Sequence, residues 1–344
     1  MQLLTIAAAI FVLGLLVTAH ELGHFATAKL TGMRVDEFAI GFGPKLLSTK
    51  RGDTVYSIRA IPLGGFNDIA GMDPSNKPDD GSGFCDKSIP ARMLVIIAGS
   101  AMNFILPVFL FFGVIFFNGY GTPSTEPVFG EVIEDMPAAQ AGLMAGDRVL
   151  SIDGKPIEKW ADFSKSLDGL SENQSVAITF ERAGAVSTVE VTPMHEGSRN
   201  LLGVRSDSTI IHPGFFESIV LAVGRTIDFT TMMLSALADL IASPSHEAVS
   251  GPIGIAQMAG QAASAGFAAL INFAALLSLN LAIINMLPVP ALDGGHFVTL
   301  VIEGLRGRPL TPKALMYTQR VGVVLMLLLM IVATKNDLVR VLHL

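Results

Sequence analysis

The sequence predicts a polytopic α-helical membrane protein with about four transmembrane helices, a membrane-associated β-hairpin and one inserted α+β domain. Hydrophobic residues make up 51% of the 344-residue chain and charged residues only 15%, whereas soluble domains carry about 25% charged residues. Three apolar blocks, residues 3–28, 93–117 and 267–287, are long enough to cross about 30 Å of hydrocarbon as helices. A fourth block, residues 321–333, spans a bilayer only if its helix begins near residue 314.

The first block is expected to be a retained span rather than a cleaved signal peptide. No basic residue precedes it and no small-residue cleavage motif follows it. Cleavage would also remove the ionisable residues within the block, His20, Glu21 and His24. With their flanking residues, the expected membrane segments are residues 1–30, 92–118, 267–300 and 314–336.

The distribution of charge predicts the orientation in the membrane. Residues 29–92 contain nine Lys or Arg and eight acidic residues, whereas residues 118–266 contain eight basic and eighteen acidic residues. Since basic loops stay in the cytoplasm, we expect the first connection inside, the long acidic segment outside, and both termini outside. Lys335 and Arg340 beside the fourth span oppose this orientation.

Charge and cysteine usage also exclude some classes of protein. The net charge of −7 gives no indication of nucleic-acid binding. Cys85 is the single cysteine, so the chain can form no intrachain disulfide and no thiolate zinc cluster.

Residues 31–91, between the first two spans, are expected to contain a β-hairpin. Residues 34–40 and 55–61 are the predicted strands, with a turn at residues 50–53 and a polar loop at residues 68–90. The first strand and the residues after it are unusually apolar for a cytosolic loop. The hairpin therefore either dips into the edge of the membrane, where non-helical backbone survives against protein or water, or is a small cytosolic hairpin.

A compact α+β domain is predicted at residues 126–207, a size at which single domains fold alone. Its residues 132–143 and 146–154 resemble a PDZ domain of the bacterial protease type. The expected strands are residues 128–133, 148–152, 176–181 and 187–191, and the expected helices are residues 138–143 and 160–167.

The resemblance implies a site for a peptide carboxylate in this domain. In such domains a Leu-Gly-Val/Ile turn offers backbone N–H groups to the carboxylate, and Leu202, Gly203 and Val204 match that turn. The alternative is that these residues form an ordinary closing strand.

Residues 213–266 are expected to lie outside the bilayer core. Residues 213–242 have apolar residues at helical spacing, interrupted by charges, which is typical of a helix on the outer membrane surface. The alternative is a helix that packs on the α+β domain. Residues 251–254, Gly-Pro-Ile-Gly, break this helix before the next span.

The strongest chemical signal is His20-Glu21-Leu22-Gly23-His24. Positions i and i+4 of a helix share a face, so both imidazoles can bind one zinc ion, with Glu21 beside them as general base. Such a pattern also arises by chance. Here it lies within an apolar span, where ionisable groups are costly without a partner, and a divalent cation supplies that partner.

A third ligand is expected from residues 285–296, at the end of the third span. Pro288 and Pro290 end the helix, which lets Asp293 turn inward. The first and third spans run in the same direction, so both motifs lie at the same depth. Asp293 could instead cap a helix, and His296 is a rival ligand; an acidic ligand better balances the charge of the metal.

The paired motifs, HELGH and NMLPVPALDGG, resemble those of the site-2 protease family of intramembrane metalloproteases. With a PDZ domain between the second and third spans, the chain is most similar to the bacterial regulator-of-sigma-E proteases of that family. Residues 38–44 and 99–104 match further stretches of the family. Many such enzymes carry two PDZ domains in tandem, whereas only one is predicted here.

The resemblance implies a set of functional residues. His20, His24 and Asp293 would hold Zn²⁺, Glu21 would be the base, and Asn285 would bind the substrate backbone near the metal. Asn285 could instead satisfy backbone groups freed by the prolines. Asn103 and Asn280 are interpreted first as residues that form hydrogen bonds between helices.

The implied activity is intramembrane proteolysis at the bacterial inner membrane. The implied substrates are single-span proteins already trimmed outside, such as anti-sigma factors or remnant signal peptides. One alternative is a non-proteolytic scaffold or receptor with a PDZ domain and a structural metal, but such a site needs no base like Glu21. Another is a soluble-type zinc protease attached to separate helices, which the position of the motif within a span opposes.

Overall fold

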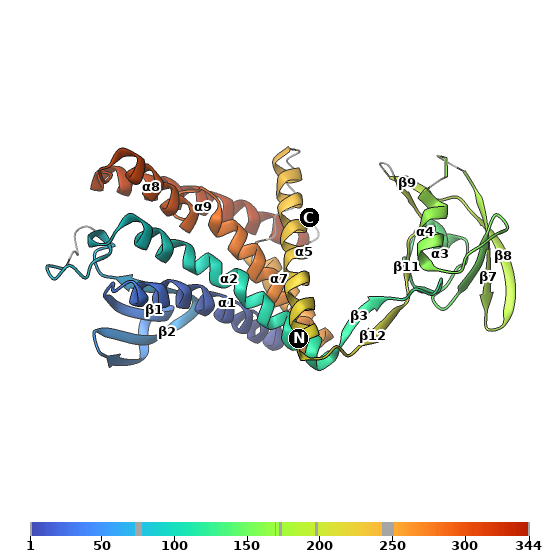
Figure 1. Cartoon of the computed structure of the whole chain (residues 1–344), viewed down its shortest axis with the longest axis horizontal. Coiled ribbons are helices and arrows are strands. Elements are labelled where there is room, and N and C mark those ends of the chain that lie inside the picture. The colour runs from blue at the N-terminus through green and yellow to red at the C-terminus, as the bar shows by residue number, and fades with distance from the viewer. Residues whose placement is uncertain are drawn as a thin grey trace. The chain divides into compact units, whose positions relative to one another are not determined.

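The computed structural model describes residues 2–72, 78–168, 170–171, 174–196, 199–242 and 251–342. It divides into two compact units (Figure 1). The membrane unit comprises Met1–Asn118 and Gly214–Leu344, and the inserted unit comprises Gly119–Pro213.

Three helices form the centre of the membrane unit: α1 (Gln2–Leu30), α2 (Ile89–Asn118) and α7 (Phe267–Met286). The first half of α1 packs with the first half of α7, through Val12 and Leu270 among others, so these two helices run in parallel. The second half of α2 joins the same cluster, whereas its first half packs near Ala28 at the end of α1. Thus α2 runs in the opposite direction, and the expected arrangement of the spans is present.

Glycine lets α1 and α2 approach closely near the end of α1. A Cβ atom on Gly23 would lie 2.2 Å from the backbone oxygen of Ala98, and one on Gly99 would lie 2.2 Å from Nε2 of His24. Small residues at helix crossings favour association in membranes because they allow backbones to touch. The contact therefore requires glycine on both helices.

The described residues contain five helices that are long and apolar enough to cross a membrane, by length and composition. Four of them contain the expected spans, and α9 (Pro312–Leu342) begins close to the position that the fourth span required. The fifth, α5 (Phe215–Ala242), is the helix expected on the membrane surface. Figure 1 shows α5 at a steep angle to α1 and α2. Its first half packs on α2 through aromatic pairs, with ring centroids 5.8 Å apart for Phe111 and Phe229.

A short helix contacts both α1 and α9. Helix α6 (Pro252–Ala265) packs on α1, where the Cα atom of Gly260 comes close to Thr5. The buried carboxylate of Asp337, in α9, accepts backbone N–H bonds from Gly251 and Gly254 at 3.1 and 2.8 Å. A negative charge at a helix N-terminus is stabilising, so Asp337 fixes α9 to α6. Helix α8 (Asp293–Arg306) and a 3₁₀ turn at Phe84–Asp86 complete the helices of this unit.

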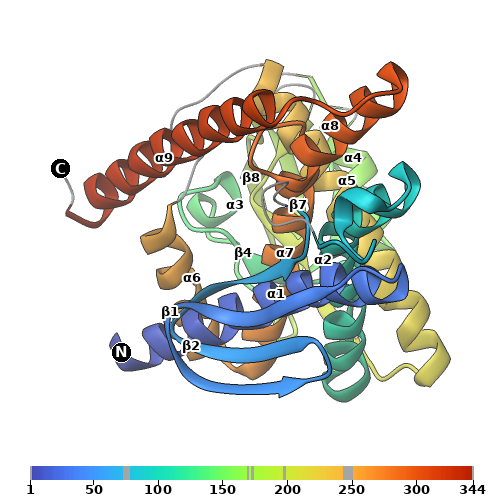
Figure 2. The same cartoon turned by 90° about the vertical axis from the view of Figure 1, so that its left-hand side faces the viewer.

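The predicted hairpin is present and longer than expected, with strands β1 (Val35–Arg51) and β2 (Thr54–Ile69). The turn lies at Gly52 and Asp53, as predicted. Figure 2 shows the hairpin alongside α1. The start of β1 pairs with β2 on both sides, so that Phe38 faces Tyr56 on one side and Asn67 on the other. The predicted strand ended at residue 61 and the polar loop was predicted from residue 68, whereas β2 continues to Ile69. The Pro and Gly residues at 62–65 are poor strand formers, which is why the local pattern did not indicate this extension.

The inserted unit is the predicted α+β domain. Its core contains Phe129, Phe163 and Ile178, all buried. The helix expected at residues 138–143 is shorter, α3 (Pro137–Gln140), because Gly142 turns the chain with a positive φ of 79°. Helix α4 is Trp160–Asp168. A four-stranded sheet has the order β6 (Lys155–Pro156), β5 (Arg148–Ile152), β7 (Val176–Arg182) and β8 (Ala185–Val191). Three strand pairs complete the unit: β3 (Tyr120–Pro123) with β12 (Ser208–Ile211), β4 (Phe129–Val132) with β11 (Val204–Ser206), and β9 (Met194–Glu196) with β10 (Arg199–Leu201).

Candidate metal centre

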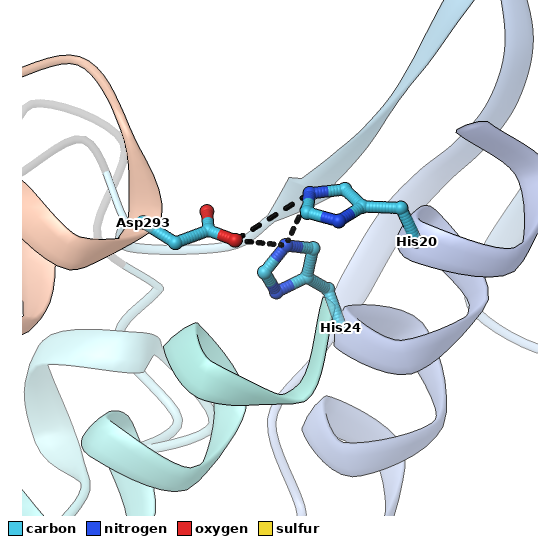
Figure 3. Close-up of side chains that lie close together, drawn as sticks. All are labelled: His20, His24 and Asp293. Atoms are coloured by element: carbon cyan, nitrogen blue, oxygen red, sulfur yellow. Dashed lines mark hydrogen bonds and ion pairs between the residues drawn. The ribbon is translucent and has the colours of Figure 1, made fainter. Parts of the chain in front are cut away.

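Two imidazoles and one carboxylate converge between α1 and the start of α8 (Figure 3). His20 and His24 are one helical turn apart on α1, and their Nε2 atoms lie 3.2 Å from each other. Oδ2 of Asp293, the first residue of α8, lies 3.5 Å from Nε2 of His20 and 3.6 Å from that of His24. The structure therefore brings together the three residues predicted to bind the metal.

The spacing and chemistry of these atoms fit a zinc ion. Ligands at about 2.0–2.1 Å on a tetrahedral centre lie about 3.3–3.4 Å from one another, close to the three separations in this cluster. Nδ1 of His24 lies 2.8 Å from the backbone oxygen of Val95, so its proton is on Nδ1 and the lone pair of Nε2 points at the cluster. Electron-rich atoms that converge in this way repel one another unless a cation lies among them.

Asp293 reaches the cluster because the chain reverses after α7. Helix α7 ends at Met286, and the next helix begins at Asp293 itself. Gly294 allows this turn, since a Cβ atom there would lie 2.3 Å from the oxygen of Leu287. On the outer side of the loop, Gly322 of α9 packs so closely that a Cβ atom would lie 2.1 Å from the oxygen of Pro290. The loop is therefore held on both sides. His296, the rival ligand, is not a member of the donor cluster.

Helix α2 contacts all three donors from behind. Besides the Val95 contact with His24, Oγ of Ser100 donates to Oδ2 of Asp293 at 3.0 Å. The side-chain amide of Asn103 lies 3.3 Å from Nδ1 of His20. The nearer amide atom is Nδ2, and Oδ1 of Asn103 is buried with no partner among the described residues. With the amide turned by 180°, Oδ1 would accept the Nδ1 proton of His20 and Nδ2 would take the position without a partner. Partners of this kind fix the orientation of metal ligands.

The sequence did not reveal these supporting residues. Residues 99–104 were noted as a stretch that matches the family, and Asn103 as a residue bonding between helices. The contact of the Asn103 side chain with His20 is itself a bond between helices, from α2 to α1, and the backbone oxygen of Asn103 also accepts a hydrogen bond from Ser278 of α7 at 2.9 Å. Ser100 carried no signal, since a serine in an apolar helix is common in membrane proteins.

The side chain of Glu21 faces the hairpin. Nδ2 of Asn67, in β2, donates to Oε2 of Glu21 at 2.6 Å and to its backbone oxygen at 2.7 Å. The strand is close to α1 here, since a Cβ atom on Gly65 would lie 3.2 Å from Cγ of Glu21. Asn67 lies beyond the strand predicted at residues 55–61 and just before the loop predicted at residues 68–90, so sequence reasoning missed this contact.

The predicted substrate-binding residues are in two places. Asn285 lies in the last turn of α7, partly buried, eight residues before Asp293, whereas Asn280 is exposed on the same helix. Leu202, Gly203 and Val204 form the expected turn in the inserted unit.

That turn is held by backbone bonds from the residue after β4 and from α3. The oxygens of Leu202 and Gly203 accept bonds from the N–H groups of Ala138 and Ile133 at 2.9 and 2.8 Å. Gly203 has a φ of 78°, and a Cβ atom there would collide with Met136. Glycine is therefore required at this turn by the backbone conformation and by the nearby Met136, independently of any ligand.

Two histidines one turn apart, a carboxylate from a second segment and an adjacent glutamate are the groups expected at the site of a metallopeptidase. The chain belongs to Peptidase family M50, whose model matches residues 8–329. It is similar to the regulator of sigma-W protease RasP of Bacillus subtilis, with 31% identity over 420 aligned positions and 98% of each chain covered. It is also 31% identical to the zinc metalloprotease RasP of Oceanobacillus iheyensis, over 98% of this chain and 99% of that one.

These relatives confirm the class expected from the sequence, a zinc metalloprotease of the site-2 type, and do not favour a scaffold. Among solved structures, the PDZ domain of an SdrC-like protein of Listeria monocytogenes aligns with 24% of this chain and 88% of its own length. That alignment has 19% identity and a TM-score of 0.22.

Proposed function

We propose that this chain hydrolyses peptide bonds in the transmembrane segments of single-span membrane proteins. His20, His24 and Asp293 hold Zn²⁺, and Glu21 is the general base. The observation that carries this proposal is the convergence of three donor atoms within 4.8 Å of one another. Two of the donor residues and Glu21 lie on α1, a helix able to cross a membrane.

Zinc, when bound, polarises the scissile carbonyl and makes it easier to remove a proton from water. Glu21 takes that proton as the water oxygen attacks the carbonyl carbon. Glu21 then gives the proton to the amide nitrogen, so that the C–N bond breaks and a carboxylic acid and an amine are released; the acid's proton passes to the amine, which leaves a carboxylate and an ammonium group. Asn285, near the start of the ligand loop, can donate a hydrogen bond to the oxygen on which negative charge develops.

A substrate helix must unwind before its carbonyl can enter this site. The β1–β2 hairpin offers a way to hold the unwound segment, because an extended peptide can add to an exposed strand edge. The second half of β2 is at the edge of the sheet and lies against α1 beside Glu21. Strand addition there would place a backbone carbonyl near the metal.

The proposed substrates and orientation are supported by one relative's name and by charge. The Bacillus subtilis relative is named a regulator of sigma-W protease, which supports substrates such as anti-sigma factors or remnant signal peptides. The acidic segment at residues 118–266 supports a bacterial inner-membrane protein with the PDZ-like unit outside and the metal toward the cytoplasm. Helix α5, despite its apolar length, would then lie along the outer face.

The PDZ-like unit would act on substrate choice rather than on chemistry. A variant with residues 128–204 replaced by a flexible linker should cleave a pre-trimmed substrate at close to the normal rate. It should also begin to cleave a substrate with its outer domain intact. If the zinc-loaded variant cleaves neither substrate, the unit is needed to form the active site, and the proposal that it selects substrates is wrong.

The proteolytic proposal is tested by metal analysis and cleavage of a model transmembrane peptide in detergent. Wild-type protein should hold one zinc per chain and cleave the peptide. Glu21→Gln should keep zinc and lose activity by about 10²–10⁴-fold, the contribution of a positioned acid or base. Zinc binding without cleavage by the wild-type protein, across several single-span peptides, would instead support the scaffold with a structural metal.

A further inference from the structure

The side chain of Glu21 is held by a residue from the hairpin and not by its own helix. The carboxylate of Glu21 accepts a hydrogen bond from Nδ2 of Asn67 at 2.6 Å. The same amide nitrogen donates to the backbone oxygen of Glu21 at 2.7 Å. Two bonds from one nitrogen fix both the backbone and the carboxylate of this residue relative to β2.

We propose that Asn67 is a positioning residue for Glu21, and that the hairpin thereby orients the base as well as offering a strand edge to the substrate. This inference rests on the proposed function, because it takes Glu21 to be the general base. Asn67 fixes Oε2, which leaves Oε1 as the oxygen free to take the proton from water.

The orientation of the Asn67 amide is determined by its partners. Both atoms that Nδ2 faces, a carboxylate oxygen and a carbonyl oxygen, are acceptors. The NH₂ group must therefore point at Glu21, because an amide oxygen in its place would meet two acceptors. Oδ1 of Asn67 is buried with no partner among the described residues. The bonds to Glu21 hold the amide in place even though its oxygen is left unpaired, which is unfavourable in itself.

Close packing leaves no space for another polar side chain at the neighbouring position on this face of β2. Gly65, two residues earlier on the same face of β2, lies against Val17 and Glu21, with room for no larger residue. Asn67 is also tied into the sheet, since its backbone pairs with Phe38 in β1. A peptide that adds to this strand would therefore bind next to the residue that holds the base.

Two substitutions of Asn67 separate positioning from folding. Asn67→Asp keeps the shape of the side chain but replaces the donor by a second carboxylate. Asn67→Val removes the donor and the charge and suits a strand. The matched control is Asp68→Asn, because Asp68 is the next residue of β2, is exposed, and points to the other face of the strand.

The full-length protein is measured for zinc per chain, thermal stability in detergent, and kcat and KM on a pre-trimmed single-span substrate. Both Asn67 variants should keep zinc and KM, while kcat falls about tenfold to a hundredfold, part of the factor of about 10²–10⁴ that a positioned base supplies. Asn67→Asp should fall further than Asn67→Val, because its carboxylate repels that of Glu21. Asp68→Asn should match the wild-type protein.

Two results would overturn the proposal. One is an unchanged kcat in either zinc-loaded Asn67 variant; the other is a rise in KM alone, which would mean that Asn67 only shapes the substrate edge. Failure of the proposed function itself is recognised separately, because the wild-type protein would then not cleave the substrate, or Glu21→Gln would cleave it normally.

Discussion

The three metal donors stand on segments packed closely against α2, whereas the carboxylate of the base is held by a strand of the hairpin. At the metal, Gly99 touches His24 and side chains of α2 contact the other two donors. At the base, one amide of β2 makes the contact. The difference indicates that close helix packing places the metal donors, while the proposed base is placed by the hairpin, the element proposed to receive the substrate.

The largest effect is expected from removing the acidic metal ligand. Asp293→Ala should abolish zinc binding and cleavage, because two imidazoles without a carboxylate leave the site one ligand short. His296→Ala, one turn further along α8, is the control and should keep one zinc per chain. Metal analysis of purified protein gives the answer, and stoichiometric zinc in Asp293→Ala would mean that another residue is the third ligand.

The next effect tests whether helix packing places the metal. A Cβ atom on Gly99 would collide with Nε2 of His24, so Gly99→Ala should displace that imidazole and weaken zinc binding by about a hundredfold, corresponding to an overpacking cost of about 1–3 kcal/mol. Gly113→Ala is a matched control on the same helix, because nothing lies near its Cβ position. Equal zinc affinities of the two variants, measured by competition with a chelator, would contradict this role of glycine.

A smaller effect is expected from the polar contacts of α2. Asn103→Ala and Ser100→Ala should each weaken zinc binding by about tenfold to a hundredfold, as loss of partners behind metal ligands commonly does. Asn103→Asp retains an acceptor for the Nδ1 proton of His20 and should lose less. Ser264→Ala in α6 is the control, since this hydroxyl bonds only to its own helix at Gly260. If Asn103→Asp weakens zinc binding as much as Asn103→Ala does, a hydrogen-bond acceptor at residue 103 does not explain the effect.

The smallest expected effect is a pH dependence in the stability of the hairpin, caused by the carboxyl group of Glu37. Burial acts to raise the pKa of Glu37, but hydrogen bonds from Ser57, Arg59 and Lys45 outweigh it and lower the pKa from 4.5 to about 2. A depressed pKa stabilises the fold fully above pH 4.5, and the stabilisation is lost as the pH falls toward about 2.

Hydrogen exchange of the hairpin amides, corrected for intrinsic rates, should show more opening at pH 3 than at pH 6. Glu37→Gln should reduce this difference, whereas Asp53→Asn at the turn should not. An unchanged difference in Glu37→Gln would show that other groups control the opening of the hairpin.

The sequence predicted the metal side of the site well and the hairpin side poorly, for physical reasons. His20 and His24 share a helix face by spacing alone, and the paired prolines before Asp293 indicated a turn. By contrast, the strand that carries Asn67 follows a Pro-Leu-Gly-Gly stretch, in which local preference opposes a strand. Pairing with β1 overrides that preference, and long-range pairing cannot be read from local pattern.

Helix α5 was ambiguous for a related reason, since length and apolar content alone do not fix its angle to the other helices.

The close contact of Gly322 with Pro290 bears on the order in which the protease becomes functional. A ribosome makes the proposed metal ligands and base before it makes α9. The contact of Gly322 with Pro290 and the bonds of Asp337 to the start of α6 therefore form only after every one of these reactive residues has been synthesised. A nascent chain that stops before Gly322 holds the complete set of these residues without that contact, so we expect maturation of the site to depend on α9.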